Sequence, residues 1–416
     1  MILMAATRFA LTLSVGNQWP EFRGPSHQGV SVATNIPVHW SSTENIAWTR
    51  PLLGSGWSSP SIANNVLYLS SATGDGKSDP LALAVSAYST HDGTELWRTP
   101  VLPRGTSPLP SIHDKNGQAS PTILVDSSRQ RLFAHFGHLG TVALDSQGRL
   151  LWEQTTLGYT PIHGNGGSPA LVDETLLFSC DGGSDPFVVG LDANTGKVRW
   201  KTPRRTSAKR TFSFSTPLAV TVDGATQVIL PGSGFVGAYN PITGSELWRV
   251  NYGEGYSVIP RPVFADGLLF IGTGYDAPTL LAINPSKASG DATSTAIAWR
   301  INKGAPNTPS VVVHNGYLFF VSDAGIASCA ESATGKILWN ERLGGGFSAS
   351  PILAEGRLYF INEEGITTVI NASSTFQILS RNDLKERVLA SLGVIDNALF
   401  IRTRTQLLRI GSKPKI

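Results

Sequence analysis

Two loops of the chain combine histidine with amide and basic side chains, which are groups suited to holding a ligand. His113, Lys115 and Asn116 lie in the longest predicted loop, and His163 and Asn165 lie in a second loop that is rich in glycine. Imidazole changes its charge near neutral pH, and loop glycines let a ligand approach the backbone. The pattern predicts a ligand site between these loops. The alternative is that both histidines only bond to backbone carbonyls.

A third loop is basic. Arg204, Arg205 and Arg210 lie close together in the sequence, and Arg261 stands between two prolines further along. Clustered guanidinium groups can hold a carboxylate or a phosphate through paired hydrogen bonds. The sequence therefore predicts a small anionic ligand at this place, such as a quinone carboxylate. A solvated basic loop is the alternative interpretation.

Signals for metals and for known catalytic motifs are weak. Asp181 and Asp185 flank a flexible Gly-Gly-Ser turn and are the weak candidates for calcium, which prefers oxygen ligands. Their spacing lacks the pattern of an EF-hand, so a simple turn is favoured and no metal site is predicted. The two cysteines, Cys180 and Cys329, lie far apart in the chain and are predicted to be free thiols. The catalytic residues stay unassigned, and the sequence leaves open whether the protein is an enzyme.

The loops are positioned by a repeat of about 50 residues. Its clearest element is a Thr-Gly turn followed by a strand that ends in tryptophan, as in residues 195–200, 243–248 and 334–339. Glycine suits the positive φ of a tight turn, and a repeat of this period indicates stacked or radial units. The tryptophans are predicted to pack between neighbouring repeats. The closing positions are Trp48, Trp97, Trp152, Trp200, Trp248, Trp299, Trp339 and Leu379.

Eight closing positions predict an all-β, eight-bladed β-propeller of four-stranded antiparallel blades, with a seven-bladed ring as the alternative. The last repeat supplies three strands before the chain ends, and an unpartnered strand lies around Trp48. Pairing this N-terminal strand with the last repeat completes the C-terminal blade and removes a sheet edge.

The predicted boundaries follow from composition. Residues 1–16 are apolar and are expected to be a signal peptide. We expect residues 17–42 to form an N-terminal arm, residues 43–411 to form one propeller domain and residues 412–416 to form a tail. The net charge of +3 gives no reason to expect nucleic acid. No later run is long and apolar enough for a transmembrane helix. We expect a monomer.

The repeats resemble the pyrroloquinoline quinone (PQQ)-type propeller repeat, which ends in Ala-x-Asp-x-x-Thr-Gly-x-x-x-Trp. Residues 191–200, LDANTGKVRW, match this ending best. The resemblance extends to quinoprotein alcohol dehydrogenases, which use PQQ and calcium, and to BamB, the outer-membrane assembly lipoprotein. The chain departs from both, because it has no adjacent cysteines and no cysteine near its N-terminus. PQQ and calcium are therefore implied by the resemblance alone.

These observations predict an exported propeller, periplasmic or secreted, that acts as a binding or scaffold protein. Its partner is expected to be a protein or a small anionic ligand held at the funnel face, where loops between strands surround the central channel. The alternative is a PQQ-dependent oxidoreductase that acts on alcohols or sugars. Because one fold hosts many functions, the repeat alone does not decide between them.

Overall fold

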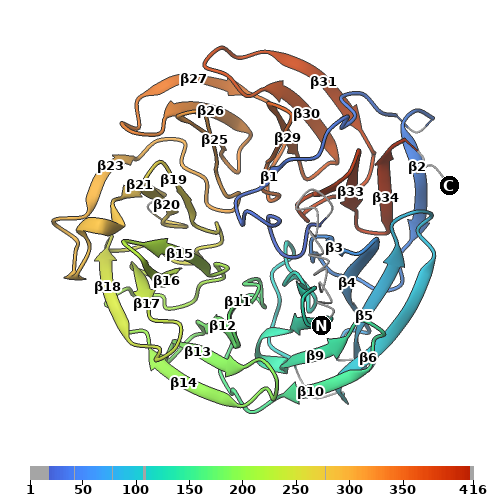
Figure 1. Ribbon diagram of the computed structural model, residues 1–416, viewed down its shortest axis with the longest axis horizontal. Coiled ribbons are helices and arrows are strands. Elements are labelled where there is room, and N and C mark those ends of the chain that lie inside the picture. The colour runs from blue at the N-terminus through green and yellow to red at the C-terminus, as the bar shows by residue number, and fades with distance from the viewer. Residues whose placement is uncertain (1–17, 42, 77, 106–108, 277, 413–416) are drawn as a thin grey trace, which may run out of the picture.

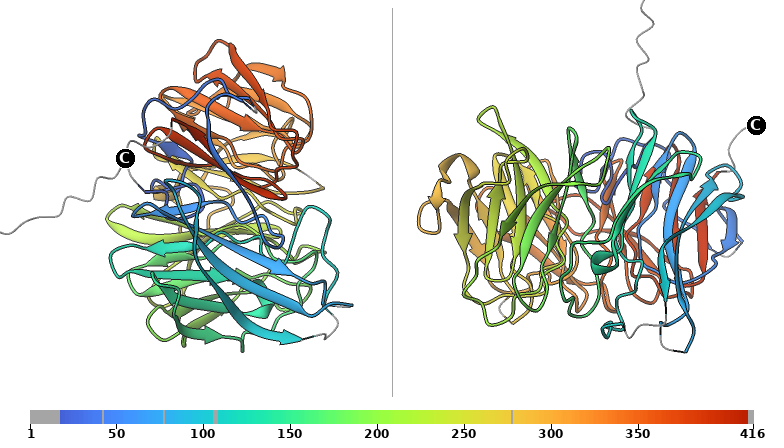
Figure 2. Two further views of the ribbon diagram at one scale, coloured as in Figure 1. Left: turned by 90° about the vertical axis from the view of Figure 1, so that its right-hand side faces the viewer. Right: turned by 90° about the horizontal axis from the view of Figure 1, so that it is seen from below.

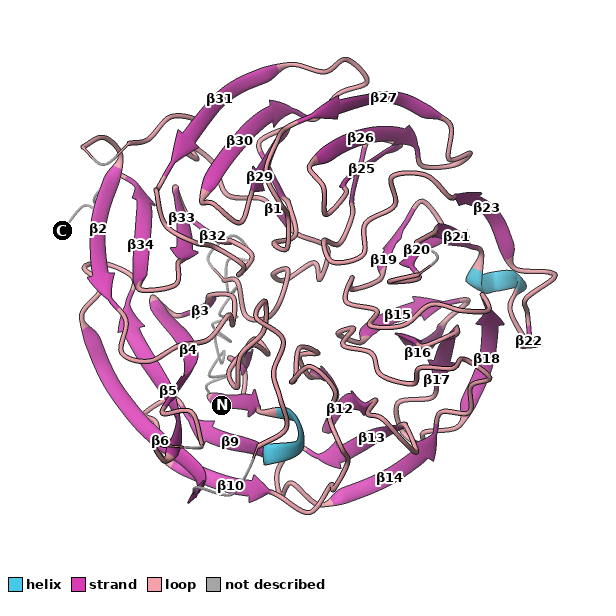
Figure 3. Cartoon of the chain, turned by 180° about the vertical axis from the view of Figure 1, so that it is seen from behind, coloured by secondary structure: helices cyan, strands magenta, loops and turns pink. Residues whose placement is uncertain are grey.

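The computed structural model describes residues 18–412 except 42, 77, 106–108 and 277. Within these residues the chain forms eight blades of four antiparallel strands, arranged as a ring around a central axis (Figure 1). This confirms the predicted eight-bladed propeller, and the seven-bladed alternative is wrong. Helix is limited to two single 3-10 turns in the described chain, Gly137–Leu139 and Pro285–Lys287 (Figure 3).

The first four blades follow the chain in order from the inner to the outer strand. Blade 1 contains β3 (Ser61–Ala63), β4 (Val66–Thr73), β5 (Leu81–Ser89) and β6 (Glu95–Gly105). Blade 2 contains β7 (Leu124–Asp126), β8 (Arg131–His135), β9 (Thr141–Asp145) and β10 (Leu150–Gln154). Blade 3 contains β11 (Ala170–Val172), β12 (Thr175–Cys180), β13 (Phe187–Asp192) and β14 (Val198–Pro203). Blade 4 contains β15 (Leu218–Val222), β16 (Ala225–Gly232), β17 (Phe235–Tyr239) and β18 (Glu246–Asn251), and β22 (Gly290–Asp291) is added outside β18.

The remaining blades use the same order. Blade 5 contains β19 (Val263–Ala265), β20 (Leu268–Gly272), β21 (Leu280–Ile283) and β23 (Ile297–Ile301). Blade 6 contains β24 (Val312–His314), β25 (Tyr317–Val321), β26 (Ile326–Glu331) and β27 (Ile337–Arg342). Blade 7 contains β28 (Ile352–Ala354), β29 (Arg357–Ile361), β30 (Ile366–Asn371) and β31 (Ile378–Asp383), and β1 (Val30–Ser31) pairs with β28. Blade 8 contains β32 (Gly393–Ile395), β33 (Ala398–Arg402), β34 (Gln406–Gly411) and β2 (Ile46–Pro51).

The tryptophans of the repeat join neighbouring blades, as predicted. Six of them donate their indole N–H to a backbone carbonyl of the next blade at 3.0–3.2 Å. The glycine of the Thr-Gly turn is needed for this contact. At Gly196, φ is +69°, and a β-carbon would lie 2.5 Å from a ring carbon of Trp152. The repeated phrase is therefore the junction between blades, since each turn receives the tryptophan of the blade before it.

Leu379 does not occupy the eighth closing position, so that prediction is wrong by one residue. In β31, Ser380 lies opposite Val369. Ser380 therefore occupies the position along the outer strand that Trp339 occupies in blade 6. The N-terminal arm covers this strand, because the Ser380 hydroxyl donates to the Val38 carbonyl at 2.5 Å. The arm thus contacts the blade where a closing tryptophan is missing.

The ring is closed by the predicted exchange of a strand. β2, from the N-terminal part of the chain, pairs antiparallel with β34 of the last blade, with Trp48 opposite Arg409. This pairing gives the last blade its fourth strand and covers an edge that would otherwise be free. The two side views show the resulting disc (Figure 2).

The N-terminal arm crosses the centre of the ring. Trp19 pairs with Ile62 of blade 1, the guanidinium of Arg23 donates to the carbonyl of Pro351 at the entry to blade 7, and Val30 pairs with Leu353 of the same blade. Trp19 and Arg23 are almost fully buried. The arm therefore lies across the axis of the ring (Figure 1), and its Phe22 lines the cavity found there.

Two further observations concern the predicted boundaries. The expected signal peptide and nearly all of the expected tail lie outside the described residues. In the part of the chain that is described, no helix has the length and apolarity needed to span a membrane. Both cysteines, Cys180 and Cys329, are free and buried, as predicted.

Candidate functional site

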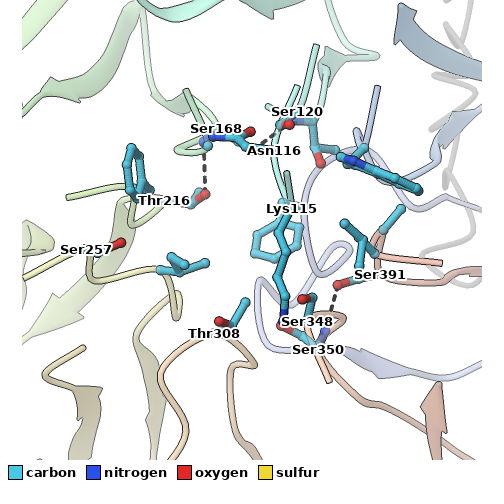
Figure 4. A pocket seen from close by; sticks show the side chains of 18 of the residues that line it. Lys115, Asn116, Ser120, Ser168, Thr216, Ser257, Thr308, Ser348, Ser350 and Ser391 are labelled. Atoms are coloured by element: carbon cyan, nitrogen blue, oxygen red, sulfur yellow. Dashed lines mark hydrogen bonds between the residues drawn. The ribbon is translucent and has the colours of Figure 1, made fainter. Parts of the chain in front are cut away.

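A cavity of about 280 Å³ lies on the axis of the ring, lined mainly by the loops that lead from the outer strand of one blade to the inner strand of the next. Its lining combines aromatic rings with many side-chain hydroxyls, and Phe22 of the N-terminal arm contributes to it. Because the arm crosses the channel, the cavity has a closed end. Figure 4 shows the hydroxyl groups arranged around its centre.

Seven hydroxyls of the inner loops form a nearly closed ring around the axis. In each case the backbone N–H of one blade donates to the side-chain hydroxyl of the next blade, at 2.9–3.1 Å. The members of this hydroxyl ring are Ser59, Thr122, Ser168, Thr216, Ser310, Ser350 and Ser391. The bonds fix the inner ends of the blades relative to one another, and six of the seven residues, all except Ser310, line the cavity.

Arg261 takes the eighth position, where the ring is interrupted. Its guanidinium donates to the carbonyl of Pro217 at 2.9 and 3.1 Å and to Glu21 of the arm at 2.8 Å. Burial alone would raise the pKa of Glu21, but the charges of Arg261 and His27 outweigh it and lower the pKa to about 2. The interruption is therefore the place where the arm is held by a buried ion pair.

The loop of residues 109–119, here called the crossing loop, extends over the mouth of the cavity. It follows β6, which ends at Gly105. The Asn116 side chain donates to the carbonyl of His163 at 2.9 Å, and the Lys115 ammonium reaches Glu363 of blade 7 at 2.7 Å. Figure 4 shows Lys115 extending from the side of Asn116 toward Ser348 and Ser350. This ion pair spans the mouth of the cavity.

An arc of aromatic rings borders the same mouth. His113 and His163 lie 5.6 Å apart between ring centroids, and the arc continues through Phe212, Tyr256 and Tyr275 at spacings of 5.2–6.2 Å. Edge-to-face contacts dominate, which is the favoured geometry for such rings. Burial and the neighbouring His113 lower the pKa of His163.

A small side chamber adjoins the cavity, since Gly166 and Phe214 line both. The amide of Asn165 lies in this chamber and accepts a hydrogen bond from Tyr159 at 3.1 Å. Asp181 is also buried there, and burial raises its pKa to about 6 although the Nε atom of Arg204 is 3.0 Å away. Asn165 therefore supports the cavity from behind.

The structure brings together some of the predicted site residues and separates the others. His113, Lys115, Asn116 and His163 all line the cavity. The four arginines do not form one patch. Arg204 is buried against Asp181, Arg205 is exposed, Arg210 pairs with Asp276 at 3.0 Å, and Arg261 is buried against Glu21.

Asp181 and Asp185 lie in different environments. Asp181 is buried beside Arg204, whereas Asp185 is exposed. Among the described residues, no cluster of three or more His, Cys, Asp or Glu side chains is placed to hold a metal ion.

Sequence reasoning missed the hydroxyl ring, the rings of Tyr256 and Tyr275, and Glu363. The ring had a signal, because a small hydroxyl residue beside proline opens most of the repeats. Its meaning depends on the contact between blades, which periodicity along one strand does not reveal. Glu363 had no signal, since its partner Lys115 lies 248 positions away in the chain.

The lining does not fit a calcium-bound quinone. PQQ carries several carboxylates, and the one ammonium group among the described lining residues, Lys115, already pairs with Glu363. Calcium is coordinated by several carboxylate or carbonyl oxygens, and no carboxylate side chain belongs to the described lining. The donor set is instead one of hydroxyls, an amide and aromatic rings.

Comparisons with known proteins give one family and several similar folds. The family described as outer membrane protein assembly factor BamB matches residues 30–165, 84–233 and 288–378, which together span more than half of the chain. Among curated proteins, no sequence matches.

The solved structures share the architecture at low identity. BamB from Moraxella catarrhalis is 16% identical over 87% of this chain and 98% of its own, with a TM-score of 0.60. Quinohemoprotein alcohol dehydrogenase from Comamonas testosteroni is 11% identical over 98% of this chain and 82% of its own, with a TM-score of 0.67. The computationally designed protein Ika8 is 12% identical over 88% of this chain and 99% of its own, with a TM-score of 0.59. At such identities the likeness shows the fold alone.

Proposed function

Because this chain belongs to the β-propeller family described as outer membrane protein assembly factor BamB, we propose that it is an exported binding protein that takes a small ligand in its axial cavity. The observation that carries this proposal is the closed end of the channel. A ring with an open axis offers a passage, whereas the arm converts this axis into a pocket with a floor, walls and one mouth. Its volume is close to the lower range of small-molecule sites, about 300 Å³.

The walls support binding because they are rigid. The hydroxyl ring and the indole contacts between blades fix the inner loops, so the lining side chains keep their positions when a ligand enters. Such preorganisation lowers the entropic cost of binding. We also propose a periplasmic or secreted location and a monomer. A protein partner on the funnel face is a second candidate, which the description of the family as an assembly factor favours.

A screen by ligand-detected nuclear magnetic resonance tests this proposal. The purified full chain is mixed with water-soluble neutral, anionic and cationic metabolites, and each signal is compared with that of Asn116→Trp. Asn116 lines the cavity, so the indole is expected to fill the mouth and abolish binding. Asp114→Trp is the matched control, because Asp114 is exposed in the same loop and lies outside the cavity. Binding that survives Asn116→Trp, or no binding by any class, contradicts the proposal.

The dehydrogenase alternative has its own test. Titration with PQQ, with and without calcium, is expected to show no saturable binding, because the lining lacks free cations and carboxylates. Saturable binding near one PQQ per chain would instead favour a quinoprotein oxidoreductase. The location is checked by cell fractionation with a periplasmic marker.

A further inference from the structure

The hydroxyl ring can still both donate and accept hydrogen bonds toward the axis. A hydroxyl has one proton and two lone pairs, and the N–H of the neighbouring blade occupies one lone pair in each member of the ring. Among the hydrogen bonds of the described residues, none uses the proton of Ser168, Thr216 or Ser391. The hydroxyl ring therefore complements groups that donate and accept at the same time, as an alcohol does.

Aromatic rings line the cavity on opposite sides. Trp57 precedes blade 1, whereas Tyr256 and Tyr275 belong to the region of blades 4 and 5 on the other side of the ring. Aromatic side chains offer a broad apolar contact together with a polar edge. Such walls suit a compact ligand that has apolar C–H faces and hydroxyl groups around its rim.

The charges of the cavity cancel. Lys115 is the one formal cation of the described lining, and Glu363 holds its ammonium at 2.7 Å. Glu363 also accepts a hydrogen bond from Ser348 at 2.6 Å. An anion would have to compete with this carboxylate for Lys115 and would meet the negative charge of Glu363 beside it. A ligand without charge leaves the pair intact.

From these three features we propose that the cavity binds a neutral polyhydroxyl compound, a sugar or a sugar alcohol, in preference to an anion. The proposal rests on the function proposed above and names the ligand class of the same cavity. The hydroxyl ring bonds to the hydroxyls of the ligand, the aromatic walls contact its C–H faces, and the Lys115–Glu363 pair lies across the mouth.

Matched pairs of ligands provide the sharpest experiment. The full chain is titrated in a calorimeter with neutral hexoses, pentoses, their disaccharides and hexitols, and with the acids D-glucuronate and D-gluconate. D-glucose and D-glucuronate share one ring and differ in a carboxylate, so they isolate the effect of charge. At least one neutral compound is expected to bind saturably, and its affinity should stay constant when the salt concentration rises, because screening acts on charges.

Variants separate the contributions of the walls. Tyr256→Leu, which removes the ring but keeps an apolar side chain, is expected to weaken binding of the neutral compound by about three- to ten-fold. Tyr256→Phe should retain the affinity. If Tyr256→Leu does not fold, Tyr275→Leu serves the same purpose on the same wall. Unchanged affinity in a folded leucine variant would remove the aromatic wall from the site.

The outcomes distinguish the two proposals. Tighter binding of D-glucuronate than of D-glucose, weakened by salt, would overturn the neutral ligand and leave the binding function in place. A second outcome would also overturn only the proposal of a neutral ligand. In it, no sugar, sugar alcohol or sugar acid binds, but another metabolite of the screen binds and loses its binding in Asn116→Trp. Absence of binding by every compound tested would remove both proposals.

Discussion

Replacing Arg261 by methionine is expected to release the N-terminal arm from the centre of the ring. Arg261 is 2% exposed and donates to Glu21, to the carbonyl of Phe22 at 2.5 Å, and to the carbonyl of Pro217. Methionine keeps much of the volume but removes the buried guanidinium from Glu21, which keeps only His27 as a neighbour that can carry a positive charge. Removal of one partner of a buried pair costs about 3–5 kcal/mol, which is about two to almost four powers of ten in an opening equilibrium.

Native-state hydrogen exchange measures this opening where it happens. The Trp19 amide donates to the Ile62 carbonyl at 2.7 Å, so its exchange reports the docking of the arm. In Arg261→Met the Trp19 amide should exchange about a hundred-fold faster or more. Amides of β25 (Tyr317–Val321), on the second strand of blade 6, serve as the internal control and should change little.

A double-mutant cycle separates the ion pair from the packing around it. Glu21→Gln combined with Arg261→Met removes both charges, and the double variant should be less destabilised than the sum of the two single variants by about 2 kcal/mol or more. Additive effects would refute the reasoning, because they would mean that Glu21 and Arg261 do not act as a pair. Trp19 exchange within about three-fold of the unmodified protein would refute it as well.

Two further predictions concern acid and the junction between blades. The pKa of Glu21 falls from 4.5 to about 2 in the folded protein, so its ionised form stabilises the docked arm above pH 4.5. This contribution, about 3 kcal/mol, should be lost as the pH falls from 4.5 to 2. The loss should appear as faster exchange of the Trp19 amide after correction for its intrinsic rate. The Glu21→Gln variant should not show it. Gly196→Ala should cost about 3 kcal/mol, because the new β-carbon meets Trp152 at 2.5 Å and φ is positive. Gly224 has a positive φ but no neighbour within 4 Å of the position that a β-carbon would take, so Gly224→Ala should lower the free energy of unfolding in urea by only about 1 kcal/mol. Equal losses in Gly196→Ala and Gly224→Ala would contradict the packing argument.

The fold was predictable from the sequence because each blade repeats the same local chemistry. The Thr-Gly turn and the tryptophan recur in most blades, so an imperfect copy such as Ser380 does not obscure the count. The loop positions of His113 and His163 could also be foreseen, since loops that leave an outer strand reach the axis in every blade. That reasoning brings four of the predicted residues to one cavity.

The remaining contacts of the site could not be predicted, because they depend on features that do not repeat. The partner of Lys115 is a turn residue of blade 7, and the partner of Arg261 belongs to the arm. Clustering of Arg204 and Arg205 in the sequence did not place their side chains together. Arg204 directly follows β14 and is buried, while the next residue, Arg205, is exposed.

The closure of the ring also sets an order on synthesis and folding. β2 precedes its partner β34 in the chain, so it is synthesised first and stays without this partner until the eighth blade has emerged. Until then the arm and β2 have no complete surface on which to dock, because the arm needs blades 5 and 7 and β2 needs blade 8. The early blades can form while the chain is still growing, but the axial cavity acquires its floor last. Any ligand of this cavity can therefore bind only after the eighth blade has formed.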